Sequence, residues 1–341
     1  MGCPASGHNL ISVNLHDLQL DFESPDAPLR ERFAEIYAHL PAAQGSRPGI
    51  SIQWRLIEAS VAPPPPVDAP LLAPGELVSY YGTVRLVFIR LPNYGLCTVD
   101  LEHGSLSGAV THACLEVDGA FEDVLMIALA PLYRRRGWFP LHAFAGLAPD
   151  GPAALISGQM GSGKTTTGLA LLNAGWKLLS NDSPLLTSRN NQVQVLAYPG
   201  HLSAFDDSLA RFEHLQQFIP SSTRQESPDK PAKRVFRAEA AFDQPWASAG
   251  VAGGVFLPEV VPGLTRSDLS PLKATEAVLQ LMPQAVEGWD KAFIAPTVQL
   301  LHRLVEQAPC YRLKLSPHLE QLPPLILQGM NNTPRQSNDQ V

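Results

Sequence analysis

The sequence predicts an α/β protein of two domains, and three observations lead to this fold class. Hydrophobic residues occupy 45% and charged residues 17% of the 341 positions, which is enough apolar material for a sizeable core. Strand-like and helix-like hydrophobic patterns alternate along the chain. Near the middle, an apolar run, a glycine-rich loop, a helical pattern and a second apolar run follow one another, which indicates a strand–loop–helix–strand unit in a parallel or mixed sheet.

Residues 1–137 are predicted to form a smaller N-terminal α+β domain. The spacing of its apolar residues predicts strands at 11–22, 84–91 and 112–119, and helices at 28–40 and 121–137. The prolines at 63–66 lack the N–H that a strand ladder needs, so they predict an extended loop. Three arginines at 134–136 lie where cations favour a helix C-terminus, and contact with phosphate is the alternative for them.

Residues 138–325 restart the pattern and are predicted to form the second domain, followed by a disordered polar tail at 326–341. Apolar runs predict strands at 138–147, 153–157, 176–182, 250–261 and 310–316, and a turn with a strand at 190–200. Helical spacing predicts helices at 165–175, 274–282 and 296–308.

Composition excludes several classes of function. The net charge of −7 gives no basic footprint, so we expect no nucleic-acid partner. No run approaches the roughly 18 apolar residues that span a bilayer, and the N-terminus lacks an export signal, so we expect no membrane association. The four cysteines have neither disulfide-framework nor zinc spacing, which is typical of a reducing cytoplasm.

The central loop matches the phosphate-binding pattern G-x-x-x-x-G-K-[ST] at Gly158, Gly163, Lys164 and Thr165. Glycines let the backbone wrap an anion, the lysine bridges terminal phosphates and the threonine hydroxyl ligates magnesium. The start of the following helix adds a positive end. The nucleotide-binding residues predicted from this motif are Gly158, Gln159, Met160, Gly161, Ser162, Gly163, Lys164, Thr165 and Thr166.

Two stretches around this loop carry a family resemblance. "PLHAFAGL" places His142 sixteen residues before Gly158, and "ALISGQMGSGKTTTGLALLNAGWKLLSND" ends in Asn181 and Asp182 at the position of an acidic pair. These stretches resemble the HPr kinase/phosphorylases and the wider group of HPr-kinase-related proteins. The resemblance is strong over 140–184 and diffuse to about 325, and it implies a P-loop kinase core of the HPr kinase/phosphoenolpyruvate carboxykinase type.

The resemblance implies an ATP-dependent kinase that uses Mg²⁺ and transfers the γ-phosphate to a serine or threonine hydroxyl of a protein or peptide. It gives Asp182 the role of catalytic base or magnesium ligand, with Thr165 as the other magnesium ligand. His142 would orient the acceptor or share its proton. Some related proteins act beside peptide-modification machinery, so the acceptor need not be HPr. The best-known relatives are hexamers, which leaves a homo-oligomer open.

The chain departs from the family pattern at Asn181, which stands where the family's base is usually assigned. An amide cannot accept a proton at neutral pH, although it can orient a hydroxyl. A nucleotide-binding regulatory or assembly protein with weak or no phosphotransfer is therefore the alternative function, and reverse phosphorylase activity is less secure than ATP binding. Glu239 is a candidate substitute for a missing magnesium carboxylate.

Other residues have a structural alternative beside the functional one. Asp182 precedes Ser183-Pro184 and would otherwise cap a turn, and His142 would otherwise be a core histidine. Lys230, Lys233 and Arg234 form a basic cluster that belongs either to a solvated loop or to a lid over phosphates. A ligand role for His201 is a remote alternative, and no arginine arrangement suits a small dicarboxylate acceptor.

Overall fold

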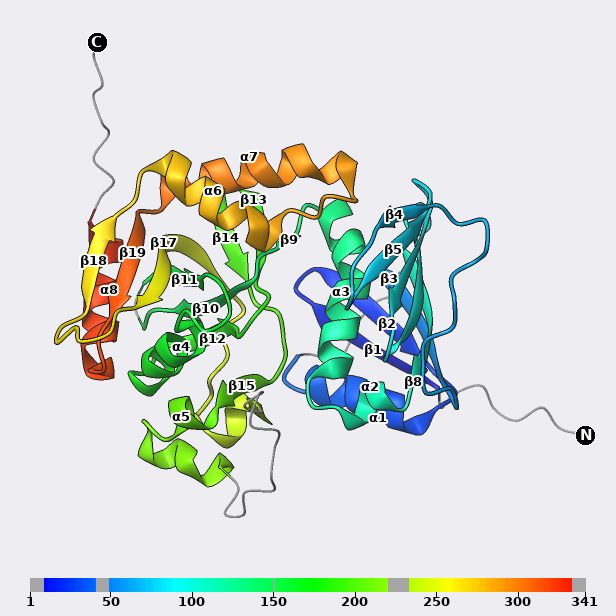
Figure 1. Ribbon diagram of the computed structural model, residues 1–341, viewed down its shortest axis with the longest axis horizontal. Helices are drawn as coiled ribbons and strands as arrows, with labels where there is room; N and C mark the ends of the chain where they lie inside the picture. Colours follow the sequence, from blue (N-terminus) through cyan, green and yellow to red (C-terminus); the bar gives the residue numbers. More distant parts are fainter. Residues whose placement is uncertain (1–8, 41–48, 150, 220–232, 333–341) are drawn as a thin grey trace, which may run out of the picture. The chain divides into compact units, whose positions relative to one another are not determined.

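The computed structural model describes residues 9–40, 49–149, 151–219 and 233–332 of the chain (Figure 1). It is a mixed α/β protein with two main sheets. Its contacts divide the chain into two compact units. Unit 1 comprises Met1–Arg136 with Gly288–Lys291, and unit 2 comprises Gly137–Glu287 with Ala292–Val341.

Unit 1 is built on an eight-stranded sheet with the strand order β1-β2-β3-β8-β7-β6-β5-β4. Strand β3 is parallel to both of its neighbours, and the remaining pairs are antiparallel. The strands are β1 (Leu10–Leu15), β2 (Leu18–Glu23), β3 (Ile50–Ile57), β4 (Leu71–Ala73), β5 (Ser79–Gly82), β6 (Leu86–Leu91), β7 (Gly95–Asp100) and β8 (Ser105–Thr111).

The helices of unit 1 pack on the apolar face of this sheet. They are α1 (Ala27–Ile36), α2 (Ala113–Glu116) and α3 (Ala120–Arg135). The Phe22 ring of β2 stacks on Phe33 of α1 with ring centroids 4.4 Å apart, and Trp54 of β3 meets Phe121 of α3 edge-on at 5.4 Å. These aromatic pairs bury the alternate residues of the strands and fix both helices to one face.

Unit 2 contains a nine-stranded mixed sheet and a two-stranded ribbon. The main path is β12-β10-β11-β17-β14-β13-β9, with β19 paired to the second half of β17 and β18 paired to β19. Its strands are β9 (Phe139–Pro140), β10 (Ala143–Leu147), β11 (Ala153–Ser157), β12 (Lys177–Ser180), β13 (Leu185–Arg189), β14 (Gln192–Leu196), β17 (Ala249–Val260), β18 (Asp268–Pro271) and β19 (Cys310–Leu315). The ribbon pairs β15 (Leu202–Phe205) with β16 (Lys233–Phe236).

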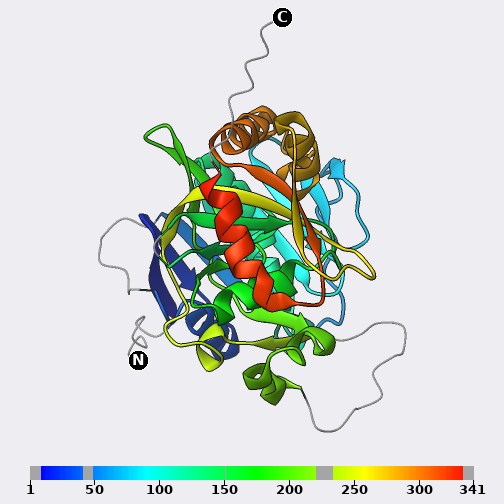
Figure 2. The same cartoon turned by 90° about the vertical axis from the view of Figure 1, so that its left-hand side faces the viewer.

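Helices cover both faces of this sheet. α4 (Lys164–Asn173) and α8 (Leu322–Asn331) share one hydrophobic cluster with the strands, and α6 (Ala274–Ala285) and α7 (Lys291–Gln307) share another. Figure 2 shows α8, in red, crossing the sheet, with α6 and α7 at its upper end. Strand β11 is buried along its whole length because neighbouring residues face opposite clusters, which explains why it reads as a continuous apolar run. The short helices are α5 (Asp206–Leu209), η1 (Glu213–Phe218), η2 (Ala238–Ala240) and η3 (Leu319–Gln321).

Several predicted elements differ from the structure. The strand predicted at 11–22 is a hairpin, because the chain turns at His16, whose φ is 58°. The strand predicted at 112–119 is wrong, because that stretch forms the short helix α2 instead. The strand predicted at 138–147 is broken into β9 and β10.

The disordered tail predicted from 326 is wrong as far as residue 331, because α8 extends to Asn331 and buries Ile326 and Met330 against Phe256 and neighbouring core residues. Residues 333–341 lie outside the described part of the chain. The predicted tail therefore began too early, because it included apolar residues that belong to a helix and lie directly before the polar end of the chain.

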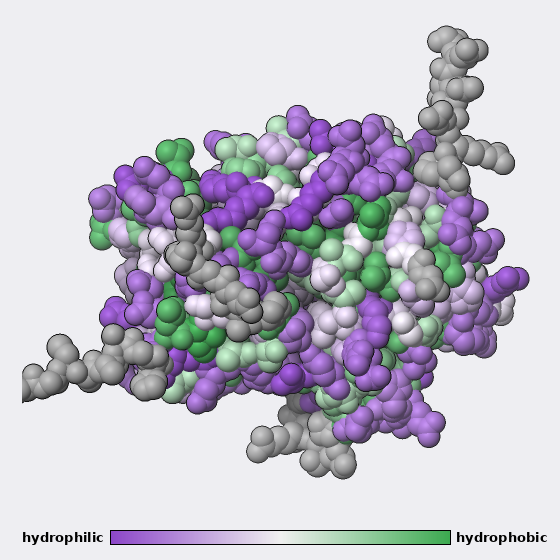
Figure 3. All heavy atoms as spheres, turned by 180° about the vertical axis from the view of Figure 1, so that it is seen from behind, coloured by the Kyte–Doolittle hydropathy of each residue, from purple (hydrophilic) through white to green (hydrophobic). Residues whose placement is uncertain are grey.

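The surface drawn in Figure 3 is largely hydrophilic, with apolar residues scattered among polar ones. Among the helices that the structure describes, none combines the length and apolar character required to cross a bilayer. Cys97, Cys114 and Cys310 are free and buried, and burial raises the pKa of the Cys114 and Cys310 thiols to about 12. These thiols are consequently unreactive in the folded chain.

Candidate active site

The glycine loop forms the predicted connection between a buried strand and a helix. It leaves β11 at Ser157 and enters α4 at Lys164, and Gly163 is the residue before the helix with a φ of 105°. A Cβ at Gly163 would meet the side chain of Leu315. Both the left-handed backbone and the close approach of β19 therefore require glycine at this position.

Lys164 closes the loop on itself. Its side chain is 8% exposed, and Nζ donates hydrogen bonds to the carbonyl oxygens of Gly158 at 2.6 Å and Gln159 at 3.1 Å. Burial lowers the pKa of Lys164, and the Asp182 carboxylate opposes that shift. An ammonium group held over the loop opening by main-chain oxygens alone is available to an entering anion.

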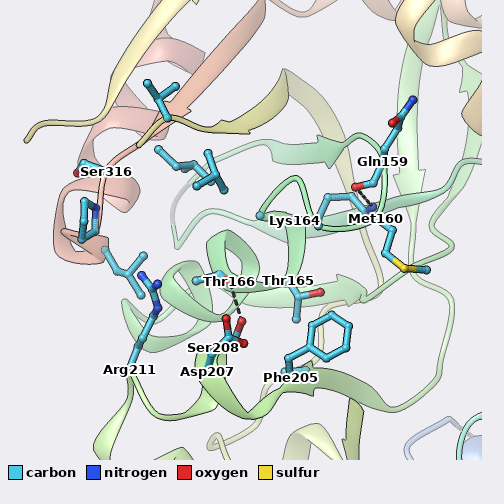
Figure 4. Close-up of a pocket in the computed structure, with 18 of the residues that line it drawn as sticks. Gln159, Met160, Lys164, Thr165, Thr166, Phe205, Asp207, Ser208, Arg211 and Ser316 are labelled. Carbon is cyan, nitrogen blue, oxygen red and sulfur yellow. Dashed lines mark hydrogen bonds between the residues drawn. The ribbon is translucent and has the colours of Figure 1, made fainter. Parts of the chain in front are cut away.

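The two threonines that follow Lys164 have different surroundings. The Thr166 hydroxyl lies 2.8 Å from the Ser208 hydroxyl, and this hydrogen bond ties α4 to α5 (Figure 4). Thr165 also lines the cavity beside the loop, with Phe205 near it in the same view. Both threonines line the cavity, and the Thr166 hydroxyl is engaged with Ser208, so the contact of Thr165 with a ligand stays a prediction of the motif.

The loop opens onto a cavity of about 380 Å³ at one edge of the sheet. The parallel strands β11, β17 and β19 all end there, and residues within two positions after each of them contribute to the wall. In open α/β sheets, ligands bind outside the carboxyl ends of the strands. Of the nine residues predicted from the motif, all but Gly158 and Ser162 line this cavity.

His142 and Asp182 come together at the same cavity because their strands are antiparallel neighbours. His142 precedes β10 and Asp182 follows β12, and the N–H of Ala143 donates to the Asp182 carbonyl at 3.1 Å. Both side chains line the cavity. The structure thus brings two sequence-predicted catalytic residues to the opening beside Lys164.

His142 is exposed on one side and closely surrounded by protein on the other. Burial lowers the pKa of His142 below its ordinary value, and the positive charge of Lys164 lowers it further. The Asp182 carboxylate opposes this shift, and Lys233 adds to it. The lowered pKa favours the neutral form of the imidazole at pH 7.

Asn181 is not part of the cavity wall. It is 8% exposed, and its amide nitrogen donates to the Asp182 carboxylate at 3.1 Å and lies 3.4 Å from the Ser203 hydroxyl. Asn181 therefore holds the Asp182 carboxylate by a hydrogen bond from outside the cavity wall. Asn181 was predicted to contact an acceptor. In this position it does not, because its amide faces Asp182 and Ser203 and it does not line the cavity.

Two further residues singled out from the sequence lie elsewhere. The Glu239 carboxylate accepts a hydrogen bond from the Trp246 indole at 2.7 Å and lies 3.7 Å from the Arg237 guanidinium. Neither Glu239 nor His201 lines the cavity. Glu239 therefore does not replace the missing magnesium carboxylate.

The cavity wall also contains residues that the sequence did not predict, which lie at or just after the ends of strands β15, β17 and β19. Asp207 and Arg211 follow β15, and in Figure 4 Arg211 and Ser316 lie on the opposite side of the pocket from Met160 and Phe205. The consecutive acids Asp206 and Asp207 directly after a short apolar run were a detectable signal. The wall residues that the motif did not indicate are Ala204, Phe205, Asp207, Ser208, Arg211, Val260, Val261, Pro262, Gly263, Leu315, Ser316, Pro317 and Leu319.

Part of the basic cluster predicted at 230–234 also reaches the site. Lys233 lines the cavity, and Arg234 pairs with Asp206 instead. Lys230 and most of the segment proposed as a lid lie outside the described residues. Within the residues that the structure describes, no group of three or more His, Cys, Asp or Glu side chains is arranged to hold a metal ion.

Comparisons with known proteins give little further information. No family model matches the chain, and no curated protein matches it. Among solved structures, the HPr(Ser) kinase/phosphatase from Coxiella burnetii is similar at 14% identity and a TM-score of 0.30, over 57% of this chain and 94% of that chain. A likeness of this strength carries no argument about function, so the function proposed for this chain is based on the geometry of the cavity.

Proposed function

We propose that this chain is an ATP-dependent phosphotransferase that moves the γ-phosphate to a serine or threonine hydroxyl of a protein or peptide. One observation carries the proposal. The P-loop lysine, Lys164, lines the same cavity as a carboxylate, Asp182, and a neutral imidazole, His142. Phosphoryl transfer requires these parts together: a cradle for phosphates, and a proton acceptor beside the attacking hydroxyl.

The loop residues suit the phosphate groups. The glycine backbone and the first N–H groups of α4 point donors at the loop opening, and Lys164 exchanges its two carbonyl partners for phosphate oxygens. Thr165 would hold Mg²⁺ together with phosphate oxygens and water, and Asp182, the other ligand that the resemblance implies, is assigned here to the acceptor hydroxyl instead, because a carboxylate bound to magnesium is a poor proton acceptor. When bound, the ion neutralises charge on the phosphates.

The acceptor hydroxyl would lie between the terminal phosphate and Asp182. Its oxygen forms a bond to the γ-phosphorus while the bond from that phosphorus to the β–γ bridging oxygen breaks and leaves ADP. The hydroxyl proton passes to the Asp182 carboxylate, which Asn181 holds at 3.1 Å. His142 orients the hydroxyl through its neutral ring.

The remaining wall suits a nucleoside. Val261, Pro262 and Leu315 contribute apolar surface to the wall, and Arg211 contributes a polar group on the side away from Met160 (Figure 4). Pockets for nucleotides typically combine an apolar lining with a few polar groups that fix orientation.

A nucleotide-binding regulator without efficient transfer is the second candidate, and Asn181 favours it. An amide at this position cannot take a proton, so all proton transfer rests on Asp182. Both candidate functions require nucleotide binding at the glycine loop, and they differ only in whether the γ-phosphate is transferred efficiently.

Two measurements on the wild type and on Lys164→Ala test the proposal. Calorimetry gives the affinity for ATP with magnesium, and γ-labelled ATP with a library of serine- and threonine-containing peptides gives transfer. We expect binding and label on a hydroxyl for the wild type, and both strongly reduced for Lys164→Ala, since a charge-assisted contact to phosphate is worth about tenfold or more in affinity.

Lys273→Ala is the matched control, because Lys273 is an exposed lysine of unit 2 outside the cavity wall. It should behave as the wild type. Tight ATP binding without label on any peptide would support the regulator, and equal affinity of Lys164→Ala and the wild type would refute the loop assignment.

A further inference from the structure

The ribbon β15–β16 carries a lysine to the phosphate end of the cavity. Lys233 is the first residue of β16 and pairs in register with Phe205, the last residue of β15. Both residues line the cavity together with Thr165. The P-loop motif contains Lys164 only, and the sequence left Lys233 in a basic cluster with two alternatives, a solvated loop or a lid over phosphates.

Lys233 is held by an aromatic ring rather than by a carboxylate. Its Nζ lies 5.6 Å from the centroid of the Phe205 ring, within range of a cation–π interaction. Among the described residues, no salt bridge joins Lys233 to an acidic side chain. A cation over a ring keeps its charge and its three donors available to an anion.

The neighbouring arginine has a structural partner. Arg234 donates from Nε to one Asp206 oxygen at 2.8 Å and from Nη2 to the other at 2.9 Å. This bidentate pair fixes the end of β16 against the residue that follows β15. The charge of Arg234 is therefore neutralised by Asp206. Of the two neighbouring cations, Lys233 and Arg234, it is Lys233 that faces the cavity.

The position of Lys233 along the cavity is defined by its neighbours. Its charge acts on both Lys164 and His142, lowering the pKa of each. Phe205 lies on the side of Thr165, opposite Arg211 and Ser316 (Figure 4). Lys233 is thus at the end of the cavity where the loop and the proposed base meet.

We infer that Lys233 is a second phosphate-binding lysine, which contacts the terminal phosphate and makes the site prefer nucleoside triphosphates over diphosphates. This inference rests on the proposed function, since it supposes a triphosphate in the P-loop. The cavity wall carries three cations, Lys164, Lys233 and Arg211, against two carboxylates, Asp182 and Asp207, and this excess of positive charge suits a polyanion. Phe205 positions the ammonium group before the ligand enters.

Calorimetry with three probes tests the inference: the non-hydrolysable triphosphate AMP-PNP, ADP and AMP, each with magnesium. The proteins are the wild type, Lys233→Ala, Lys233→Arg and the exposed control Lys273→Ala. We expect Lys233→Ala to weaken AMP-PNP binding about tenfold or more while ADP affinity changes less than about twofold. Lys233→Arg should retain most of the triphosphate affinity, and Lys273→Ala should match the wild type.

Several outcomes would overturn the inference while leaving the proposed function intact. One is an unchanged AMP-PNP affinity of Lys233→Ala, and another is an equal loss for AMP-PNP and ADP. A third is unchanged nucleotide affinity with a raised KM for the peptide acceptor, which would place Lys233 against the acceptor. A wild type that binds none of the three probes would refute the proposed function and the inference with it. Because Lys233 is exposed, thermal unfolding should be the same for all four proteins.

Discussion

Asn181 and Asp182 are neighbours in sequence with different surroundings. Asp182 lines the cavity, whereas Asn181 is buried behind it and donates a hydrogen bond to its carboxylate. The sequence distinguished the two by chemistry, since only Asp182 can take a proton, but it could not show which side chain reaches the cavity, because successive side chains at a strand end point in different directions. The half-buried carboxylate therefore lines the cavity, and the buried amide contacts it from outside the cavity wall.

The position of a residue was predictable where neighbours in sequence set it, and was not predictable where it depends on tertiary contacts. Lys164 and Thr165 lie in one contiguous motif, and their placement follows from its sequence. Glu239 was a reasonable magnesium ligand by residue type, yet Trp246 and Arg237 hold its carboxylate away from the cavity. Phe205 and Ser316 could not be predicted, since β15 belongs to the ribbon and β19 to the main sheet, and only tertiary packing brings the ends of both to the loop.

His142 gives a pH prediction. Because its pKa is lowered in the folded chain, the ring is neutral at pH 7 and becomes protonated only below its ordinary value of about 6.5. If the neutral ring orients the acceptor, transfer should stay constant from about pH 8 to 6.5 and fall at lower pH. His142→Gln should transfer more slowly and lose this acid limb.

The measurement is the rate of transfer from labelled ATP against pH, with both substrates saturating. A variant profile that keeps the wild-type acid limb would show that another group is responsible for it. Circular dichroism at each pH controls for unfolding.

At the level of elements, the strand–loop–helix unit of β11 and α4 was predictable because its signals are all local: an apolar run, glycines and a helical pattern. The hairpin of β13 and β14 was indicated in the same way by Asn190 and Asn191, which adopt φ values of 51° and 59°. The short helix α2 was missed because four residues carry too little periodicity to distinguish a helix from a strand.

The junction of the loop and α4 depends on Gly163. An alanine there would occupy a left-handed conformation, which costs about 1–2 kcal/mol, and would also press on Leu315 of β19. We expect Gly163→Ala to lower the free energy of unfolding by more than about 2 kcal/mol and to weaken nucleotide binding.

Gly175→Ala separates the two effects. Gly175 has a similar φ of 85°, but a Cβ there would have no atom within 4 Å. Its substitution should therefore cost only about 1–2 kcal/mol, the strain alone. Urea unfolding of both variants measures this, and equal losses would show that the contact with Leu315 is not limiting.

At the scale of the whole molecule, the sequence indicated a boundary near residue 137, and contacts divide the chain after Arg136. The segment Gly288–Lys291 belongs to unit 1 although it lies between two helices predicted in the second domain. Local patterns cannot reveal such an assignment, because it depends on Trp289 stacking on Tyr80 at 4.7 Å and on the charges around Asp290.

Asp290 is the centre of a buried ion pair. It is 4% exposed and accepts hydrogen bonds from Arg134 at 3.1 Å and from Arg135 at 2.9 and 3.2 Å. Arg135 and Arg136 also donate to the carbonyl oxygens of Pro131 and Leu132 in the last turn of α3, at 2.9 and 3.2 Å, so the predicted capping role stands beside this link within unit 1. Removing one partner of a buried pair leaves an uncompensated charge, so Asp290→Ala should lower the free energy of unfolding by about 3–5 kcal/mol.

Asp68→Ala is the control for this prediction, because Asp68 is exposed in the same unit. Its substitution should change the unfolding free energy by less than about 0.5 kcal/mol. Urea unfolding that gave the two variants the same stability would show that the Asp290 pair contributes nothing to unit 1.

The account depends most on the cooperation of the phosphate loop with Asp182. Asp182→Asn keeps the shape of the side chain and removes its ability to take a proton, and Asp243→Asn, at an exposed aspartate outside the cavity, is the control. The decisive measurement pairs ATP affinity with single-turnover transfer for these two variants and the wild type. We predict that Asp182→Asn keeps its ATP affinity within about threefold and loses transfer by about a hundredfold or more. Equal transfer by Asp182→Asn and the wild type would contradict the account.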